Sequence, residues 1–409
     1  MSRLGPWPAG MNSVLPDNVE PTRDTPVPLR SAVNVDITDE GKVRTRVGTT
    51  QQVPATLAHS LWSGENGTLV VLDGVLSMLS ESLLPTPIAQ DFGSTPVCYA
   101  DAAGSTYLSN GYVSYRIFQG ALRAWGIETP ARQPDAAYAN IGILSIGTYL
   151  ISCTFVDADG EESGCELPTV AVLTALGGIQ LTNMPAPLSA QALFVRVYMS
   201  TVDGSILYRQ VDLPAGTTEY TITAATSDGA VLRTELLNPV PPGTSIAHCK
   251  GRMYSALGNV LYYSEPLWYG LCSLNTNFQM FPAPITLLVA VPDGLFVCAD
   301  KTYFYAGADS QDPLRVVAPY GAVANSASLI PNSTDVMWLS TRGLVRAATD
   351  GSLKALTEGA IAMQFAGDGA SIYREQNGIK QYVSTATQAE VSSLAASSYM
   401  EADIIRGGI

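Results

Sequence analysis

Short strand–turn–strand patterns recur along this chain, and they constrain its fold more than any other feature. In each pattern, two alternating apolar segments flank a turn sequence that contains Gly or Asp, often Asn-Gly or Asp-Gly, the strongest short-range hairpin signals. Six such hairpins are predicted, at Thr68–Leu79, Ser105–Phe118, Arg252–Tyr263, Gly294–Tyr305, Val336–Arg346 and Ser371–Val383. The chain is therefore expected to be all-β.

The spacing of these hairpins favours a repeated fold. Their starts are separated by 37, 147, 42, 42 and 35 residues, and four of these steps lie close to the roughly 40–45 residues of a β-propeller blade. The remaining step exceeds one blade by about a hundred residues, the size of a sandwich domain. We therefore predict a β-propeller of about six blades with an inserted domain. An open β-sandwich built from similar hairpins is the alternative.

The insertion has a strand pattern of its own. Apolar runs at Gly147–Val156, Thr169–Leu173 and Ala192–Ser200 are separated by turns rich in Pro and Gly, which predicts an immunoglobulin- or fibronectin-like β-sandwich. The predicted organisation is an extended arm (1–29), a first propeller part (30–140), the inserted sandwich (141–238), a second propeller part (239–385) and a C-terminal tail (386–409).

The charge and cysteine content argue against several classes of protein. The formal net charge is −14 and the 22 Lys and Arg residues are scattered, whereas nucleic-acid binding needs clustered basic side chains. The six cysteines lack metal-site spacing and are expected to be buried free thiols, although Cys153 and Cys165 could face each other across a hairpin. No targeting signal or apolar run of membrane-span length is found, so we expect assembly in the cytoplasm.

No group of residues in the sequence points to catalysis. Only two histidines, His59 and His248, are present, and no nucleophile, zinc or phosphate-binding motif occurs. The acidic run Asp157–Gly164 begins like a calcium loop, but it lacks the later ligands of an EF-hand and lies between strands. We expect it to be a solvated turn, and we predict no enzyme activity, no metal and no cofactor.

Aromatic residues concentrate in predicted strands, where packing accounts for them. Trp268 and Tyr269 differ because they follow Pro266 in a loop, and a loop aromatic is a candidate interface anchor. With Arg252 and Tyr254, which lie in the hairpin before this loop, they form our set of candidate interface or structural anchors.

The segment Arg30–Gly48 predicts one further hairpin. It sets acidic and amide side chains opposite basic ones, which is a favourable cross-strand arrangement. The residues concerned are Asn34, Asp36, Lys42, Arg44 and Arg46. Because this hairpin lies outside the six already counted, we expect it to pair with the terminal hairpin Ser371–Val383 and to close the propeller.

Three features of the sequence resemble one known family. Ala-Val-Asn-Val-Asp-Ile…Gly-Lys…Arg-x-Arg-x-Gly at Ala32–Gly48 is similar to the opening of bacteriophage tail and DNA-stabilisation proteins. Gly-Arg-x-Tyr…Leu-x-Tyr-Ser-Glu-Pro…Tyr-Gly at Gly251–Gly270 resembles a second landmark of that group, and the acidic turn within the insertion resembles a third. The chain departs from the group's pattern at Val47, where Pro is usual, and at Cys249, where a basic residue is common.

The resemblance implies a structural role in the virion. In that family, such a protein forms a ring, often a hexamer, at the head–tail junction or tail nozzle below the portal and its adaptor. The ring would surround double-stranded DNA without binding it specifically, and an acidic lumen suits this role because a basic one would hold the phosphates. The alternative is a carbohydrate- or receptor-binding propeller; a propeller hydrolase would need catalytic residues that the sequence lacks.

Overall fold

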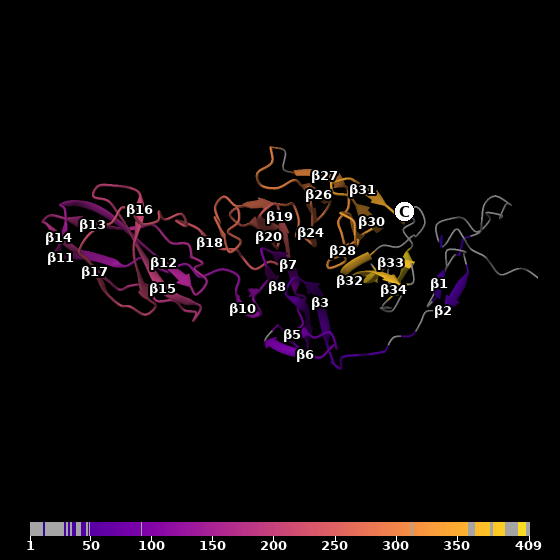
Figure 1. The fold of residues 1–409 in the computed structure, drawn as a ribbon. Helices are drawn as coiled ribbons and strands as arrows, with labels where there is room; N and C mark the ends of the chain where they lie inside the picture. Colours follow the sequence, from indigo (N-terminus) through magenta and orange to yellow (C-terminus); the bar gives the residue numbers. More distant parts are fainter. Residues whose placement is uncertain are drawn as a thin grey trace, which may run out of the picture. The chain divides into compact units, whose positions relative to one another are not determined.

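The computed structural model describes residues 11–12, 28–29, 32, 35–37, 42–45, 48, 50–90, 92–311, 314–358, 365–376, 379–388 and 400–405. These residues contain no helix, and their regular structure consists of many small β-sheets (Figure 1). The predicted all-β class is therefore confirmed. No helix that is long and apolar enough to span a membrane occurs in the described part of the chain.

Five sheets share one plan, in which four antiparallel strands lie side by side in sequence order. They are β3 (Ala58–Gly64), β4 (Gly67–Leu72), β5 (Val75–Leu79) and β6 (Pro85–Ala89); β7 (Cys98–Ala102), β8 (Ser105–Ser109), β9 (Ser114–Phe118) and β10 (Ala121–Ala124); β19 (Ser245–Cys249), β20 (Arg252–Leu257), β21 (Val260–Tyr263) and β23 (Phe278–Met280); β24 (Leu287–Val291), β25 (Gly294–Cys298), β26 (Thr302–Tyr305) and β27 (Leu314–Ala318); β28 (Ser328–Leu329), β29 (Val336–Ser340), β30 (Gly343–Ala347) and β31 (Leu353–Ala355). A sixth sheet has three strands, β32 (Phe365–Gln376), β33 (Ile379–Gln388) and β34 (Met400–Ile405).

All six predicted hairpins are present, and each contributes two neighbouring strands of one of these sheets. They are β4–β5, β8–β9, β20–β21, β25–β26, β29–β30 and β32–β33. The first turns at Asp73 and Gly74, whose φ angles of +49° and +83° suit the two-residue hairpin turn expected of Asp-Gly. The outer strands were not predicted because they are short and partly exposed, as in β6, so their alternation is weak.

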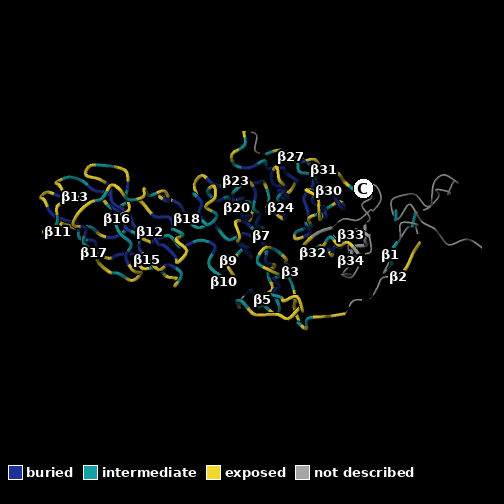
Figure 2. Tube along the Cα trace, viewed as in Figure 1, coloured by how far each residue is buried: buried dark blue, intermediate teal, exposed yellow. Residues whose placement is uncertain are grey.

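The chain divides into two compact units. One comprises Leu57–Leu257 and Leu261–Gln279, and the other comprises the described residues of Met1–Thr56, Gly258–Val260 and Met280–Ile409. Within each unit, sheets that follow one another in sequence share buried cores (Figure 2). Leu69 packs with Leu108, Tyr107 with Met253, Phe296 with Trp338, and Leu344 with Tyr382.

Residues between β10 and β19 form two sheets around one core, which we call the two-sheet body. One sheet is β11 (Asp135–Leu144), β14 (Gly177–Thr182) and β17 (Tyr220–Ile222); the other is β13 (Thr169–Leu173), β12 (Gly147–Asp157), β15 (Ala192–Ser200) and β16 (Leu207–Pro214). Buried side chains of both sheets, including Ile151, Ile179, Val195 and Ile222, pack together. The predicted boundary after residue 140 falls inside β11. Beside the body, β18 (Asn238–Pro239) pairs with β22 (Leu271–Cys272).

The six cysteines are free thiols, and all but Cys98 are buried. The predicted free state is therefore confirmed, and the alternative of a Cys153–Cys165 disulfide is not realised. Burial raises the pKa of both thiols, that of Cys165 to about 11. A thiol held neutral in this way is a poor nucleophile, so these residues contribute to packing.

The hairpin near the N-terminus is present, and among the described residues its two strands pair only with each other. β1 (Val35–Ile37) pairs with β2 (Val43–Thr45), and Asp36 lies opposite Arg44, with Oδ2 3.9 Å from the Arg44 Nε. Asn34 and Arg46 lie outside the described residues, and Lys42 is exposed. Among the described residues, β1 and β2 form a sheet of their own. No pairing of β1 or β2 with Ser371–Val383 occurs among the described residues, where β33 pairs with β32 and β34.

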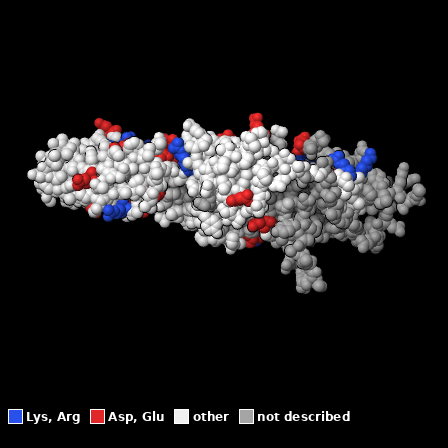
Figure 3. Space-filling view, turned by 90° about the horizontal axis from the view of Figure 1, so that it is seen from below, with Lys and Arg blue, Asp and Glu red and all other residues white. Residues whose placement is uncertain are grey.

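Charged side chains are dispersed over the surface. On the face drawn in Figure 3, Asp and Glu alternate with a few Lys and Arg, and no broad basic area is visible among the described residues. This dispersion follows from the scattered basic residues in the sequence.

Candidate functional site

The loop Ser264–Leu271 carries two of the predicted anchors, and β20 holds it in place. The Arg252 guanidinium donates to the Ser264 carbonyl at 2.7 Å, and the Met253 amide donates to the Ser264 hydroxyl at 3.0 Å. Arg252 is buried, and its guanidinium lies 5.6 Å from the centre of the Tyr263 ring. Arg252 is thus placed to fix the start of the loop from inside the protein.

At the tip of the loop, Leu267 and Trp268 point two apolar side chains toward solvent. Leu267 is 71% exposed and Trp268 is 39% exposed. Leu267 has a φ of +62°, a conformation that costs a non-glycine residue about 1–2 kcal/mol. It is held there by its amide, which donates to the Gly251 carbonyl at 2.8 Å, while the Trp268 amide donates to the Glu265 carbonyl at 3.2 Å. A fixed loop with exposed apolar side chains has the geometry of an interface anchor.

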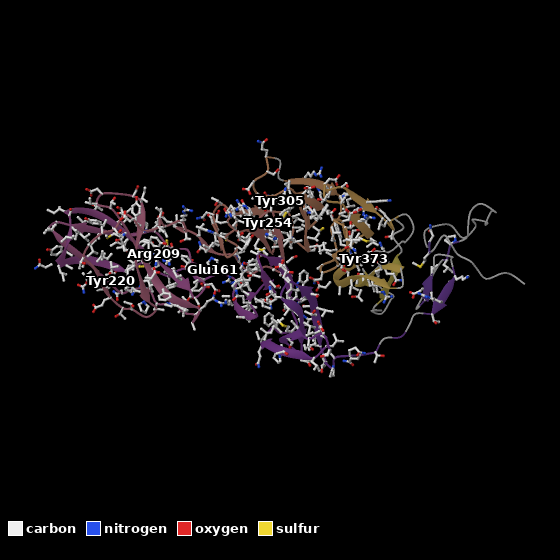
Figure 4. The ribbon with its side chains drawn as sticks, in the orientation of Figure 1. Glu161, Arg209, Tyr220, Tyr254, Tyr305 and Tyr373 are labelled. Carbon is white, nitrogen blue, oxygen red and sulfur yellow. The ribbon has the colours of Figure 1, made fainter. Side chains whose placement is uncertain are left out.

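Two further residues of the four predicted anchors, Tyr269 and Tyr254, face inward. Tyr269 is half-buried, and its ring lies 5.3 Å from that of His248 and 6.0 Å from that of Tyr107. The Tyr269 carbonyl accepts a hydrogen bond from the Trp125 indole at 2.8 Å. Tyr254, labelled in Figure 4, is almost fully buried. Of the four, only Trp268 is on the surface, and the exposed neighbour Leu267 was missed because aliphatic residues are usually assigned to cores.

A second group of residues, the Arg116 cluster, joins β9 and β10 to the acidic loop of the two-sheet body. It consists of Arg116, Arg123, Asp157, Asp159 and Glu161. The Arg116 guanidinium lies 2.5 Å from Glu161, 3.4 Å from Asp159 and 3.5 Å from Asp157. Glu161 is labelled in Figure 4, on the side of the body toward β10.

The Arg116 cluster corrects part of the expectation of a solvated acidic turn: residues 158–160 are exposed, but the base of the turn is not. The Asp157 side chain is fully buried and that of Arg116 is nearly so. The second Asp157 oxygen accepts the amides of Asp159 and Glu161, both at 2.9 Å. A guanidinium thus satisfies carboxylates that, in a calcium loop, would face an ion. Sequence reasoning could not find this partner, because Arg116 precedes Asp157 by 41 residues.

Burial raises the pKa of Glu161; Arg116 opposes this shift, while the carboxylates of Asp157 and Asp159 reinforce it. Three acids around one buried guanidinium therefore leave net negative charge at the junction. Arg123, whose Nη1 lies 2.5 Å from Asp159 on the more exposed side, partly compensates for this charge.

A third group lies on the outer face of β12, β15 and β16. Arg196 binds Asp212 with two hydrogen bonds of 2.8 and 3.0 Å and also donates to Glu162 at 3.0 Å. The hydroxyls of Tyr198 and Thr154 donate to Glu162 at 2.7 and 2.6 Å. Burial and the Glu162 carboxylate raise the pKa of Tyr198. This network fixes the loop that carries Glu162 against the sheet.

The contacts of the second and third groups hold elements of the fold together. In the part of the chain that the structure describes, no set of three or more His, Cys, Asp or Glu side chains could hold a metal ion. The buried charges of the second and third groups bind one another, so their geometry favours rigidity. The exposed pair Leu267 and Trp268 remains the candidate binding site.

No protein-family model and no curated protein matches this chain. Among solved structures, it is similar to the extracellular domain of a one-component system from B. thetaiotaomicron, with 12% identity over 85% of this chain and a TM-score of 0.24. This chain covers 58% of that one's length. It is also similar to the N-terminal domain of Nup159, with 10% identity, a TM-score of 0.21 and coverage of 82% of this chain and 88% of the other. Overlaps at such TM-scores carry no argument about fold or function.

Proposed function

We propose that this chain is a structural protein of a bacteriophage tail. In this proposal, several copies, six by analogy with the family that the sequence resembles, form a nozzle or stabilisation ring around the DNA exit channel. The ring lies below the portal and its adaptor in the virion, is assembled in the host cytoplasm, and has no enzyme activity. Its six sheets are the blades of a β-propeller, and the two-sheet body is an inserted immunoglobulin- or fibronectin-like domain.

The order of the sheets is the observation that carries the proposal. Five four-stranded sheets and one three-stranded sheet follow one another along the chain, and the two-sheet body lies between the second and the third. This is the order expected of a propeller with an insertion, in which each blade packs on the next. Shared cores between sequence neighbours support the same arrangement.

The two hairpin motifs behind the family resemblance each contain strands that the structure describes. The first includes β1 and β2, and the second spans β20, β21 and the loop Ser264–Leu271. The net charge of −14 supports a channel role, because an acidic wall does not retain DNA phosphates. We assign both motifs a role in assembly.

Electron microscopy of the purified protein and of the virion from the same genome tests this proposal. We expect closed rings in the purified sample and density for the chain on the tail axis. Mapping Asp and Glu onto the ring should then give an acidic lumen. Monomers at all concentrations, together with no copy at the tail axis, would remove the proposal.

A carbohydrate- or receptor-binding module is the second candidate, and the exposure of Leu267 and Trp268 favours it. Aromatic side chains on a rigid loop can stack on a sugar ring. A glycan array tests this with the wild-type protein and Trp268→Ala, using Tyr112→Ala as the control because Tyr112 is also an exposed aromatic. Binding by the monomer that is lost only in Trp268→Ala would favour this function over the ring.

A further inference from the structure

One end of the two-sheet body exposes an unusual number of large apolar side chains. They are Tyr138, Ile141, Ile143, Ile146, Val170, Val172 and Leu176. Ile143, at 73% exposure, and Val172, at 63%, are as open as typical charged surface residues. We call this group the apolar end. Contiguous exposed apolar surface of this kind marks an interaction site in soluble proteins.

Backbone pairing brings these residues together. Leu144 lies opposite Gly177, and Gly147 lies opposite Leu173, so the β11–β12 and β13–β14 turns are neighbours. The Tyr138 hydroxyl donates to the Leu176 carbonyl at 3.2 Å. β12 runs from Gly147 at this end to Asp157 in the Arg116 cluster, a distance of about 35 Å for a strand of this length. The apolar end is therefore remote from the junction with β9 and β10.

Charge is almost absent from the apolar end. The sequence has no Lys, Arg, Asp or Glu between Asp135 and Asp157 or between Glu166 and Arg196. On the face drawn in Figure 3, the outermost part of the body, at the left, shows no charged residue. Asp203 lies beside it, where its carboxylate accepts the Thr148 amide at 2.9 Å. An acidic protein thus carries one region without charge repulsion.

From these observations we infer that the apolar end binds a second copy of this chain. Two copies at −14 each repel one another over most of their surfaces, and they approach at least cost where both are uncharged. Interface centres are likewise depleted of charge. This contact deepens the self-association that the proposed ring requires, because it names the surface through which copies meet.

The strand edges favour a polypeptide partner over a lipid bilayer. β11 and β13 are the edge strands of their sheets. Edge strands pair with other chains unless Pro, charged residues or a β-bulge protects them. The regular part of β11, Ala136–Ala139, which precedes the register shift in this strand, has none of these. Lipid tails offer no hydrogen bonds to such an edge. The region also lacks the Lys, Arg and Trp residues that hold proteins at a membrane surface.

Sedimentation velocity over a concentration series tests the inference with a charged double variant, Ile143→Glu with Val172→Glu. Each glutamate would be buried in the contact without a partner. We therefore expect the dissociation constant for self-association to rise on the order of tenfold or more. The matched control is Leu167→Glu with Leu188→Glu. It adds the same charge at exposed positions of the same body, in the loops after Cys165 and after β14. The dissociation constant of this control for self-association should lie within about twofold of the wild-type value.

The outcomes separate this inference from the ring proposal. If the Ile143/Val172 variant assembles like the wild type, the inference is wrong and the ring stands. If the wild type forms only dimers that this variant dissolves, the contact is right and the ring is wrong. A wild type that stays monomeric removes both. Binding to phosphatidylcholine vesicles by the monomer, lost in the same variant, would replace the second copy by a membrane.

Discussion

At the scale of single residues, Arg116 decides the state of the acidic loop. Its guanidinium is the cation that faces Asp157, Asp159 and Glu161 from β9. A carboxylate that is fully buried, as Asp157 is, needs a paired charge or several donors. The Asp157 side chain has both, since it also accepts two loop amides. One residue of a neighbouring sheet therefore stabilises the turn that the sequence presents as an isolated acidic run.

Arg116→Ala tests this role. It leaves the buried Asp157 carboxylate without its cation, and breaking a buried pair in this way costs about 3–5 kcal/mol. Arg123→Ala is the matched control because Arg123 forms an ion pair with Asp159 of this loop and is more exposed than Arg116; its loss should cost about 1 kcal/mol or less. Chemical denaturation measures both free energies of unfolding. Equal costs would show that Arg116 is not the key partner.

His248 gives the molecule a pH dependence that can be assigned to one residue. Burial lowers the pKa of His248, so the unfolded chain binds a proton there at a higher pH than the folded chain. Stability is therefore full above about pH 6.5, the unfolded value, and falls as pH drops toward the lowered folded value. His248→Phe, which retains a ring beside Tyr269, should flatten this part of the profile. Parallel profiles for His248→Phe and the wild type, from unfolding at several pH values, would contradict the assignment.

At the scale of elements, the segment Ser163–Cys165, which follows the acidic turn, is hydrogen-bonded both to β12 and to the C-terminal segment of the two-sheet body near Leu236. The Ser163 amide donates to the Phe155 carbonyl at 2.8 Å, and the Leu236 amide donates to the Cys165 carbonyl at 2.8 Å. Gly164 lies between these contacts, where an added Cβ would fall 1.7 Å from the Leu237 carbonyl oxygen. Only glycine allows the two backbones to approach so closely.

Gly164→Ala should therefore destabilise the protein by about 3 kcal/mol, the upper part of the usual range for overpacking, since backbone rather than a flexible side chain would have to move. Gly160→Ala is the control in the same turn. Its φ is +81° and nothing lies within 4 Å of the added Cβ, so the cost is limited to about 1–2 kcal/mol for the left-handed conformation. Thermal and urea unfolding would compare the two. A smaller loss in Gly164→Ala than in Gly160→Ala would refute the close approach.

At the scale of the whole molecule, the two-sheet body has a core of its own. Its buried cluster runs from Ile127 to Ile222 and takes side chains from both sheets. A domain with an independent core can fold alone. Its link to the rest of the compact unit runs through the Arg116 cluster and through the pairing of Asn238–Pro239 with Leu271–Cys272.

Residues 127–240 expressed alone should fold and unfold cooperatively. The fragment should be less stable than the body in the full chain, because Asp157 and Glu161 lose Arg116. Circular dichroism melts and dispersed amide signals in NMR spectra would show the fold. Because Arg116 is absent from the fragment, Asp157→Asn should destabilise it less than it destabilises the full chain; an equal effect would contradict the assigned role.

The sequence by itself determined the all-β class, the six hairpins and the free cysteines, because turn chemistry and alternation act over a few residues. Trp268 was proposed as an anchor in the same way, as an aromatic that follows Pro266 in a loop. The tertiary structure alone decided that Asp157 faces Arg116, that Tyr254 and Tyr269 turn inward, and that β34 pairs with β33. It also gathered Ile143 and Val172 at one end of the body. These features depend on contacts between residues far apart in the chain, and no local pattern encodes which distant partner a charge, ring or strand edge will meet.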